Sequence, residues 1–483
     1  MSSTTLKRLA FISKIAGIEL LIITGGFIVS LLVALDFHES LYPFILSGLI
    51  TLSPGSLLLL TGTKRSYTIK KRDAYLTVSI SWLILGFIGS LPFIVSHAIP
   101  SVLDALFESF SGFTTTGASI LDDIESLPKS ILFWRSLTHW IGGIGIIILV
   151  IIVLPSLKIS GYHLFSVESS LQEKIKPRVK SIGKSLFAVY LFLTAFEFLL
   201  LKAGNMNWFE SACHSFGTIA TGGFSPKSDS IAGYSDYIQY VIMVFMLLSG
   251  INFTVHYYLL TGRVSKIGQN EELKFYLKVI ALFGTIITII LMSYSGLPFG
   301  EAFRKGWFQV VSIITCTGFA TDDYMVWPVS AWVLLFFAMF LGGSTGSTAG
   351  GIKMARYLIL IKNIRQFYIR ALNPHVVYPI KLNKNVISQE MNQSILVFIT
   401  TYFIVFVIGS ALLMSTGLSL ATSAGSAATC MAGIGPGLEA TGPASNYAHI
   451  PGIAKAILIA LMLIGRLEIF SVLVLFTRSY WKP

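Results

Sequence analysis

Charged residues are scarce in this chain of 483 residues: Asp, Glu, Lys and Arg make up 12% of it, whereas 54% is hydrophobic. An average soluble domain carries about 25% charged residues, so too few side chains are available to cover a soluble exterior. The same composition excludes an intrinsically disordered chain, which combines low hydrophobicity with high net charge. The class that remains is a protein that crosses a membrane many times.

Cysteine is also scarce, since Cys213, Cys316 and Cys430 are the three in the chain. They are too few and too scattered for a disulfide framework or a zinc site. The basic residues near the start of the chain precede an apolar stretch of about 20 residues, which is longer than the core of a cleavable signal. This stretch is therefore predicted to be the first membrane helix.

Ten apolar runs are long enough to cross a membrane. They lie near 15–35, 41–62, 75–97, 131–157, 184–201, 237–262, 275–297, 329–369 (interrupted), 394–416 and 453–477. Four shorter segments, 103–117, 208–222, 300–318 and 419–435, cannot cross and end in small residues. We interpret them as re-entrant half-helices followed by loops. Irregular backbone is tolerated at membrane depth only inside protein or around water, so the four segments imply one shared aqueous feature.

The net charge of +12 divides unevenly between the two predicted membrane faces. Of the 35 basic residues, 27 are assigned to the side of the chain ends, 7 to the other side and one, Arg466, to a span. Of the 23 acidic residues, 6 and 14 fall on these sides, and Glu19, Glu197 and Glu468 lie within spans. The positive-inside rule places both termini in the cytoplasm. Membrane orientation thus explains the basic excess without nucleic acid, and an acidic outer face would concentrate cations.

The half-helices recur with a common ending, which indicates a fourfold internal repeat. Their endings are Thr-Thr-Thr-Gly at 114–117, Ala-Thr-Gly-Gly-Phe-Ser at 220–225, Thr-Gly-Phe at 317–319 and Gly-Ile-Gly-Pro-Gly at 433–437. Long periods with matching hydropathy indicate a repeat architecture. The predicted fold is an all-α membrane protein with four helix–pore-helix–helix repeats around one ion pore. The boundaries are 67–165, 166–264, 265–375 and 376–483, preceded by a helix pair at 1–66.

A half-helix that ends in mid-membrane directs its partly negative C-terminal end toward the centre. The following loops can turn backbone carbonyls toward an ion and replace its hydration shell. The candidate ion-binding residues are Thr115, Thr116, Gly117, Ala220, Thr221, Gly222, Cys316, Thr317, Gly318, Gly433, Ile434 and Gly435. Asp104, Glu108, Glu210 and Glu301 lie near the starts of the first three half-helices, where acids complement the helix dipole, and the fourth half-helix lacks such an acid.

Residues 342–351 interrupt the eighth span with five glycines, each of which costs about 1 kcal/mol of helix propensity. We interpret this segment as a movable plug below the ion site, and close helix packing through small residues is the alternative. The candidate gate comprises Gly342, Gly343, Ser344, Thr345, Gly346, Ser347, Thr348, Ala349, Gly350, Gly351 and Arg466. A charge in mid-span must face protein or water. For Arg466 the choice lies between a positive charge beside the pore and a structural salt bridge to Glu197 or another acid.

Two other classes of protein deserve a comparison with these patterns. Gly342-Gly343-Ser344-Thr345-Gly346 matches the nucleophile-elbow motif, so an intramembrane serine hydrolase that uses Ser344 is an alternative. This motif requires a strand–turn–helix setting, a histidine and an acid, and no acid is obviously placed beside His139 or His256. A secondary transporter with inverted repeats is also conceivable, but the units here begin on the same side each time.

The endings quoted above resemble the Trk/Ktr/HKT superfamily of potassium transporters, and its TrkH branch in particular, over essentially the whole chain. The resemblance implies one quarter of a filter per repeat, an intramembrane gating loop in the third repeat and an arginine in the final helix. Relatives that carry sodium often have Ser at the first glycine, so Gly117 favours potassium, although sodium or another monovalent cation remains an alternative. Ile434 departs from the Thr of the other loops.

The resemblance further implies a non-enzymatic protein of the bacterial cytoplasmic (inner) membrane that carries K⁺ and holds no cofactor of its own. It implies a homodimer in membrane lipid and a cytoplasmic, nucleotide-binding ring partner of the TrkA kind, docked on the basic inner face.

Overall fold

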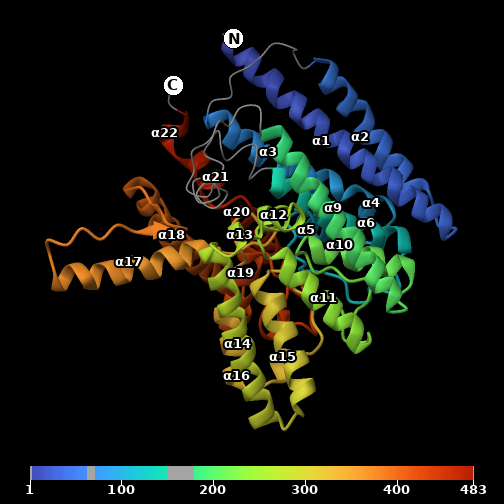
Figure 1. Ribbon diagram of the computed structural model, residues 1–483. Coiled ribbons are helices and arrows are strands. Elements are labelled where there is room, and N and C mark those ends of the chain that lie inside the picture. The colour runs from blue at the N-terminus through green and yellow to red at the C-terminus, as the bar shows by residue number, and fades with distance from the viewer. Residues whose placement is uncertain (1–2, 62–70, 149–178, 482–483) are drawn as a thin grey trace.

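The computed structural model describes residues 3–61, 71–148 and 179–481, and its regular structure is almost entirely helical (Figure 1). The first half contains α1 (Ser3–Asp36), α2 (Tyr42–Thr61), α3 (Lys71–Gly89), α4 (Leu91–Val95), α5 (Val102–Phe113), α6 (Lys129–Ile148), α9 (Val179–Ala203), α10 (Trp208–Ile219), α11 (Asp236–Ser249), α12 (Phe253–Leu260) and α13 (Val264–Ile267). The second half contains α14 (Glu271–Ser295), α15 (Phe299–Ile314), α16 (Val329–Ala338), α17 (Met354–Leu372), α18 (Gln389–Met414), α19 (Leu420–Ala432), α20 (Gly452–Arg466), α21 (Phe470–Leu473) and α22 (Arg478–Trp481). Short 3₁₀ turns lie at Tyr324–Val326, Glu439–Thr441 and Val474–Phe476.

Six of the described helices are long and apolar enough to cross a membrane, and eight segments qualify if each of two bent helix pairs is one span. The remaining two predicted crossings have local explanations. The run near 131–157 forms α6 and then continues into residues outside the described ranges. The run near 329–369 is divided into the short apolar helix α16 and the helix α17.

All four predicted half-helices are present, as α5, α10, α15 and α19. Three begin at a polar N-cap whose side chain accepts a backbone N–H: Ser101 from Asp104, Asn207 from Glu210, and Ser419 from Thr422. The third starts after Pro298, which fixes φ and has no N–H to satisfy. Local sequence therefore determines where each half-helix begins.

Within the described residues the second helix is broken in three of the repeats, whereas the sequence indicated a break only in the third. Helices α11 and α12 meet at a bend of 102°, and α20 meets the helical segment 470–476 at 108°. After the first bend, Asn252 caps the N-terminus of α12. At the second bend, Glu468 and Ile469 adopt positive φ values. Since these breaks involve a cap and two strained residues rather than a run of glycines, hydropathy did not reveal them.

The helices of the leading pair, α1 and α2, pack against each other through close backbone contacts. A Cβ on Gly17 would lie 2.9 Å from the carbonyl oxygen of Gly55, so glycine permits the approach of the two helices. The two chain ends lie together (Figure 1): Arg8 pairs with Asp73 at 2.7 Å, and the Tyr480 hydroxyl donates to the Arg72 carbonyl at 2.8 Å.

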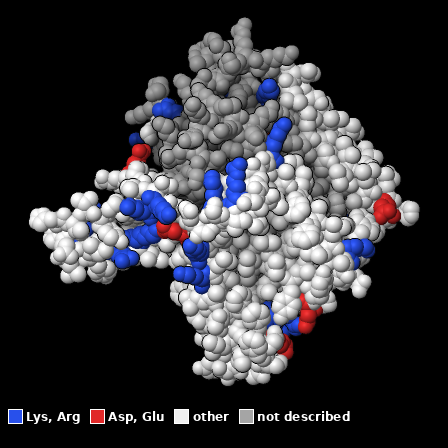
Figure 2. Space-filling view, viewed as in Figure 1, with Lys and Arg blue, Asp and Glu red and all other residues white. Residues whose placement is uncertain are grey.

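Helix α17 projects from the body of the molecule (Figure 1), and the hairpin of β1 (Lys381–Leu382) and β2 (Asn385–Val386) follows it in the chain. Figure 2 shows Lys and Arg gathered over α17 and the adjoining surface. This part of the chain belongs to the face that the sequence predicts to be cytoplasmic.

Candidate functional site

The four pore helices, α5, α10, α15 and α19, end in the same backbone turn. The first residue of each turn has a positive φ: 51° at Thr115, 53° at Thr221, 57° at Cys316 and 74° at Gly433. Two residues later a glycine has a positive φ: 78° at Gly117, 84° at Gly223, 81° at Gly318 and 97° at Gly435. We call 115–118, 221–224, 316–319 and 433–436 pore loops 1 to 4. In loop 2 the residue that corresponds to Gly117 is thus Gly223, one position after Gly222.

These glycines pack against one another in a closed ring. A Cβ on Gly117 would overlap the carbonyl oxygen of Gly222, one on Gly223 that of Thr317, and one on Gly318 that of Ile434. A Cβ on Gly435 would lie 2.8 Å from the carbonyl oxygen of Thr116, which returns to loop 1. Each glycine therefore faces the carbonyl of the same loop position in the next repeat. The four loops surround one axis in chain order.

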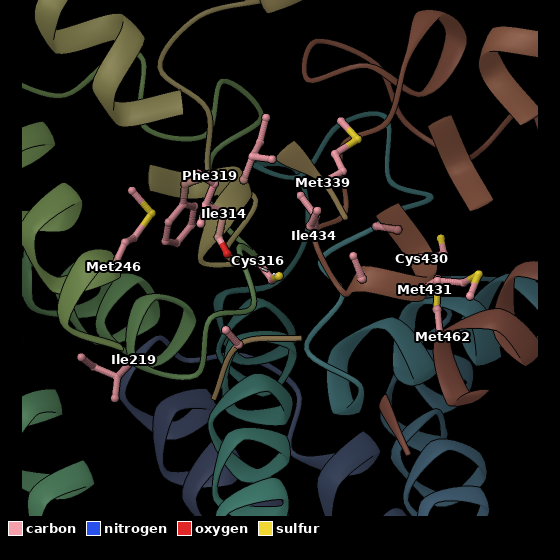
Figure 3. Packing of buried hydrophobic residues seen from close by; sticks show 14 of the residues in the cluster. Ile219, Met246, Ile314, Cys316, Phe319, Met339, Cys430, Met431, Ile434 and Met462 are labelled. Carbon is pink, nitrogen blue, oxygen red and sulfur yellow. Dashed lines mark hydrogen bonds between the residues drawn. The ribbon is translucent and has the colours of Figure 1, made fainter. Parts of the chain in front are cut away.

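This ring brings together the C-terminal ends of the pore helices and the backbone carbonyls of the pore loops. Figure 3 shows Ile219, Ile314 and Met431, near the ends of α10, α15 and α19, around a common centre. Helix C-termini carry partial negative charge, and inward carbonyls can replace the hydration shell of a cation. Among the described residues, no group of three or more His, Cys, Asp or Glu side chains is placed to hold a metal ion. The backbone dipoles at the ring favour a cation.

Neutral hydroxyl groups brace the loops from behind. Thr114 bonds to Thr116 and Thr315 to Thr317, each at 2.8 Å between hydroxyl oxygens. The Tyr447 hydroxyl donates to the Gly435 carbonyl at 2.8 Å, and its backbone N–H donates to the Ser119 carbonyl at 2.8 Å. Burial raises the pKa of the Tyr447 phenol well above its ordinary value, so the phenol remains a donor. Tyr447 thus links loop 4 to loop 1.

The acids near the pore-helix starts differ in part from expectation. Asp104, Glu210 and Glu301 do lie in first turns. Glu108 lies farther along α5, buried and paired with Arg135, so it does not serve the helix start. The fourth helix does have an acid at its start: Glu439, from the loop after it, accepts hydrogen bonds from the Ser419 and Thr422 hydroxyls. The sequence did not reveal this contact because Glu439 lies outside the helix that it serves.

The position nine residues before each ring glycine carries a buried polar side chain, a recurrence that the comparison of the half-helix endings did not include. These residues are Glu108, His214, Gln309 and Ser426. Glu108 accepts from the Ser119 hydroxyl at 2.9 Å, and a ring nitrogen of His214 lies 3.2 Å from the corresponding Ser225 hydroxyl. A search for polar residues at a fixed offset within the repeats would have found them.

The segment 342–351 is non-helical and largely buried beneath the pore helices. The Thr348 hydroxyl donates to the carbonyl of Ile219, the last residue of α10, at 3.0 Å. The Ser344 N–H donates to the Gly250 carbonyl at 2.8 Å. A Cβ on Gly350 would overlap the carbonyl oxygen of Ala432. The segment therefore contacts the ends of two pore helices.

One carboxylate joins this segment to the start of α17. Oε1 of Glu272, in the first turn of α14, accepts the backbone N–H of Thr345 at 2.7 Å and that of Ala355 at 2.9 Å. It also accepts from the Thr345 hydroxyl at 3.2 Å. No sequence pattern singles out Glu272, because a first-turn glutamate is ordinary at a helix start.

Arg466 is buried beside the same segment. It donates to the Thr348 carbonyl at 2.9 Å and to the Gly142 carbonyl at 3.4 Å, rather than to a carboxylate of the described residues. Glu468, two residues later, pairs instead with the buried side chain of Arg356. Lys353 donates to the Ala349 carbonyl. Three cationic side chains thus lie around 342–351.

The setting of Ser344 differs from that of a serine nucleophile. It lies in a non-helical segment within a helical region rather than at a strand–turn–helix junction. Within the described residues, neither His139 nor His256 is hydrogen-bonded to it: the His256 ring contacts the Leu248 carbonyl at 2.8 Å, and His139 packs on Phe224 with centroids 4.1 Å apart. A nucleophile needs a base within hydrogen-bond reach.

Multiple apolar spans, four half-helices and a closed ring of carbonyl-bearing loops define a membrane protein built to pass cations. The family model described as TrkH, cation transport protein, matches residues 42–482, and the chain belongs to this family. It is 36% identical to the Trk system potassium uptake protein TrkH of Escherichia coli strain K12, over 98% of this chain and 99% of that protein. It is 33% identical to TrkI of Halomonas elongata, over 99% and 98%.

Its fold also matches the crystal structure of the potassium transporter TrkH from Vibrio parahaemolyticus. The TM-score is 0.90 at 33% sequence identity, over 98% of this chain and 100% of that one. The all-helical architecture with pore-helix repeats is therefore confirmed.

Proposed function

We propose that this chain carries potassium ions across a bacterial cytoplasmic membrane through the ring formed by pore loops 1 to 4. The observation that carries the proposal is the closed contact of each ring glycine with a carbonyl of the next repeat. The names of the relatives, which are potassium uptake proteins, support potassium as the ion. The relatives are transporters, which accords with a protein that is not an enzyme.

In this proposal the backbone carbonyls of Thr116, Gly222, Thr317 and Ile434 coordinate the ion. Because these oxygens belong to the backbone, Ile434 contributes as well as threonine does, and its side chain does not weaken the site. The ring includes Gly223 beside the predicted Gly222. The repeats 67–165, 166–264, 265–375 and 376–483 each supply one quarter, and the pair at 1–66 packs outside them.

The proposed gate is the segment 342–351 together with Arg466. Support comes from the bond between Arg466 and the Thr348 carbonyl, and from the bond between Thr348 and the end of α10. A positive charge at this point opposes the passage of a cation until the segment moves. Glycine at both ends of the segment, with φ of 78° at Gly342 and 72° at Gly351, provides backbone conformations for hinges.

We further propose a homodimer with both termini in the cytoplasm. The exposed surface of α17 is evidence for a dimer contact with a second copy of the chain, because this helix projects from the body with large apolar side chains exposed. These are Ile361, Ile364, Phe367, Tyr368 and Leu372. The basic residues over α17 and its surroundings support a cytoplasmic, nucleotide-binding regulatory subunit (Figure 2). The word "system" in the names of the relatives accords with further subunits.

The experiment that tests this function is the flux of K⁺ or Rb⁺ into lipid vesicles that contain the purified protein. We expect uptake of both ions and much slower uptake of Na⁺. Equal uptake of Na⁺ and K⁺ would assign the chain to a less selective cation transporter of the same fold. An absence of cation flux, with and without a regulatory subunit, would overturn the proposal.

A further inference from the structure

Glu108 and Arg135 form a buried ion pair behind the first two pore loops. Glu108 lies on α5 and Arg135 on α6, with 2.5 Å between Oε1 and Nε, and their side chains are 0% and 3% exposed. Removal of two charges from water is costly, so a buried ion pair is weak grounds for a role in stability alone. The remaining contacts of both side chains indicate what the pair does.

Glu108 holds the chain where it leaves pore loop 1. Its Oε1 accepts from the Ser119 hydroxyl at 2.9 Å, and its Oε2 accepts the backbone N–H of Ile120 at 3.0 Å. Both residues follow loop 1 directly. A single carboxylate on the pore helix thus fixes the point at which the loop turns back.

Arg135 holds pore loop 2 from the other side. One of its terminal nitrogens donates to the Ser225 carbonyl at 2.9 Å, and its guanidinium lies 3.5 Å from the centroid of the Phe224 ring. One turn later on α6, His139 packs on the same Phe224, and a Cβ on Gly222 would overlap the His139 ring. The α6 face that carries Arg135 and His139 therefore supports the backbone of loop 2.

The junction between loops 1 and 2 is charged, whereas the junction between loops 3 and 4 is neutral. There the Tyr324 hydroxyl donates to the Gly437 carbonyl at 2.5 Å. Both contacts are 2.5 Å long, and a hydrogen bond between charged groups is about twice as strong as a neutral one. The charged pair is therefore the stiffer of these two connections.

We propose that the Glu108–Arg135 pair determines ion specificity: it fixes loops 1 and 2 relative to each other and so sets the spacing of the Thr116 and Gly222 carbonyls. This inference rests on the proposed function of the ring. Both side chains act through the loop backbone and are positioning residues. A loss of the pair allows the two loops to relax, and the ring then accommodates sodium more easily.

The test measures K⁺ and Na⁺ flux in vesicles for wild type, E108Q, R135Q and the double variant E108Q/R135Q. We expect the K⁺/Na⁺ ratio to fall about tenfold in each single variant, the change that corresponds to one lost hydrogen bond to a charged group. The ratio stays low in the double variant, in which no unpaired charge remains. R135K keeps the charge but not the planar fork, and we expect an intermediate ratio.

The matched control is D236N. Asp236 on α11 pairs with Arg304 on α15, so this more exposed pair likewise joins a second helix to a pore helix, in this case the pore helix of the following repeat. We expect D236N to keep the wild-type ratio. If the paired variants fold poorly, S119A removes only the hydroxyl bond to Glu108, and we expect a smaller fall in the ratio.

Three results would overturn the inference. They are a wild-type ratio in folded E108Q and S119A, a wild-type ratio restored in the double variant, and an equal loss in D236N. A wild-type ratio in the double variant would mean that an unpaired charge, rather than altered loop geometry, lowers the ratio in the single variants. Failure of the proposed function is separate, because it appears in the wild-type protein as an absence of selective cation flux.

Discussion

The α-carbon of Gly318 lies against the backbone carbonyl of Ile434 in the neighbouring pore loop, so closely that a methyl group on Gly318 would overlap that oxygen. The same contact recurs around the ring. Glycine is required for two independent reasons: φ is 81° at this position, and the neighbouring backbone occupies the space that a side chain would need. The width of the ring thus depends on the absence of Cβ atoms.

Substitution of a ring glycine should damage ion selection more than overall folding. For Gly318→Ala and Gly117→Ser, we expect the K⁺/Na⁺ flux ratio to fall by about tenfold or more, since backbone strain of this kind costs on the order of 1–3 kcal/mol. Gly300→Ala is the control, because a Cβ on this α15 residue meets nothing within 4 Å. An unchanged ratio in Gly117→Ser would remove the assignment of the filter.

The register of loop 2 yields a suppressor prediction. A Cβ on Gly222 would overlap the His139 ring, whereas one on Gly223 would overlap the backbone carbonyl of Thr317. We therefore expect His139→Ala to restore part of the flux lost in Gly222→Ala, because a side chain can be shortened. The same second substitution should not rescue Gly223→Ala. Equal rescue of both would contradict the register given by the backbone angles.

Most of the fold could be predicted because its signals are local. N-cap residues such as Ser101 and Asn207 indicate where the half-helices begin. Glycine and threonine at a recurring spacing indicate where they end. The spans follow from length and apolarity. These features depend on neighbours in the chain, which a single sequence displays.

The rest depends on contacts between distant segments. The sequence around Gly222 and Gly223 offers two glycines, and only the position of Thr317 in space shows which one corresponds to Gly117. Likewise, Glu439 serves a helix that ends before it, and Glu272 binds a segment more than seventy residues away. Such pairings leave no local pattern in the sequence. The sequence therefore located the candidate site but could not predict which of its residues contact one another.

Tyr447 should contribute to both stability and ion selection through its bond to the Gly435 carbonyl. Tyr447→Phe removes this bond, and we expect a lower melting temperature and a lower K⁺/Na⁺ ratio. Because the pKa of Tyr447 is raised in the folded protein, its contribution to stability is complete below about pH 10 and is lost as the pH rises further. Melting temperature measured against pH checks this, with Tyr294→Phe as an exposed control. A similar decline in Tyr447→Phe and wild type above pH 10 would contradict the assignment.

The contacts of Glu272 predict how the segment 342–351 is held. Glu272→Ala leaves the buried N–H groups of Thr345 and Ala355 without their acceptor, and each such loss costs about 1–3 kcal/mol. We expect faster K⁺ flux in the absence of a regulatory subunit, because the segment is less firmly fixed below the ring. Glu272→Gln keeps an acceptor oxygen and should resemble wild type.

Removal of the segment itself should have a larger effect in the same direction. We expect a deletion of 344–349 to raise flux above that of Glu272→Ala, and Arg466→Gln to raise it by removing the positive charge beside Thr348. Rubidium uptake into vesicles measures all three variants, with the folded fraction determined by size-exclusion chromatography. Slower flux in a well-folded deletion variant would show that the segment packs the helices together and does not close the ion path.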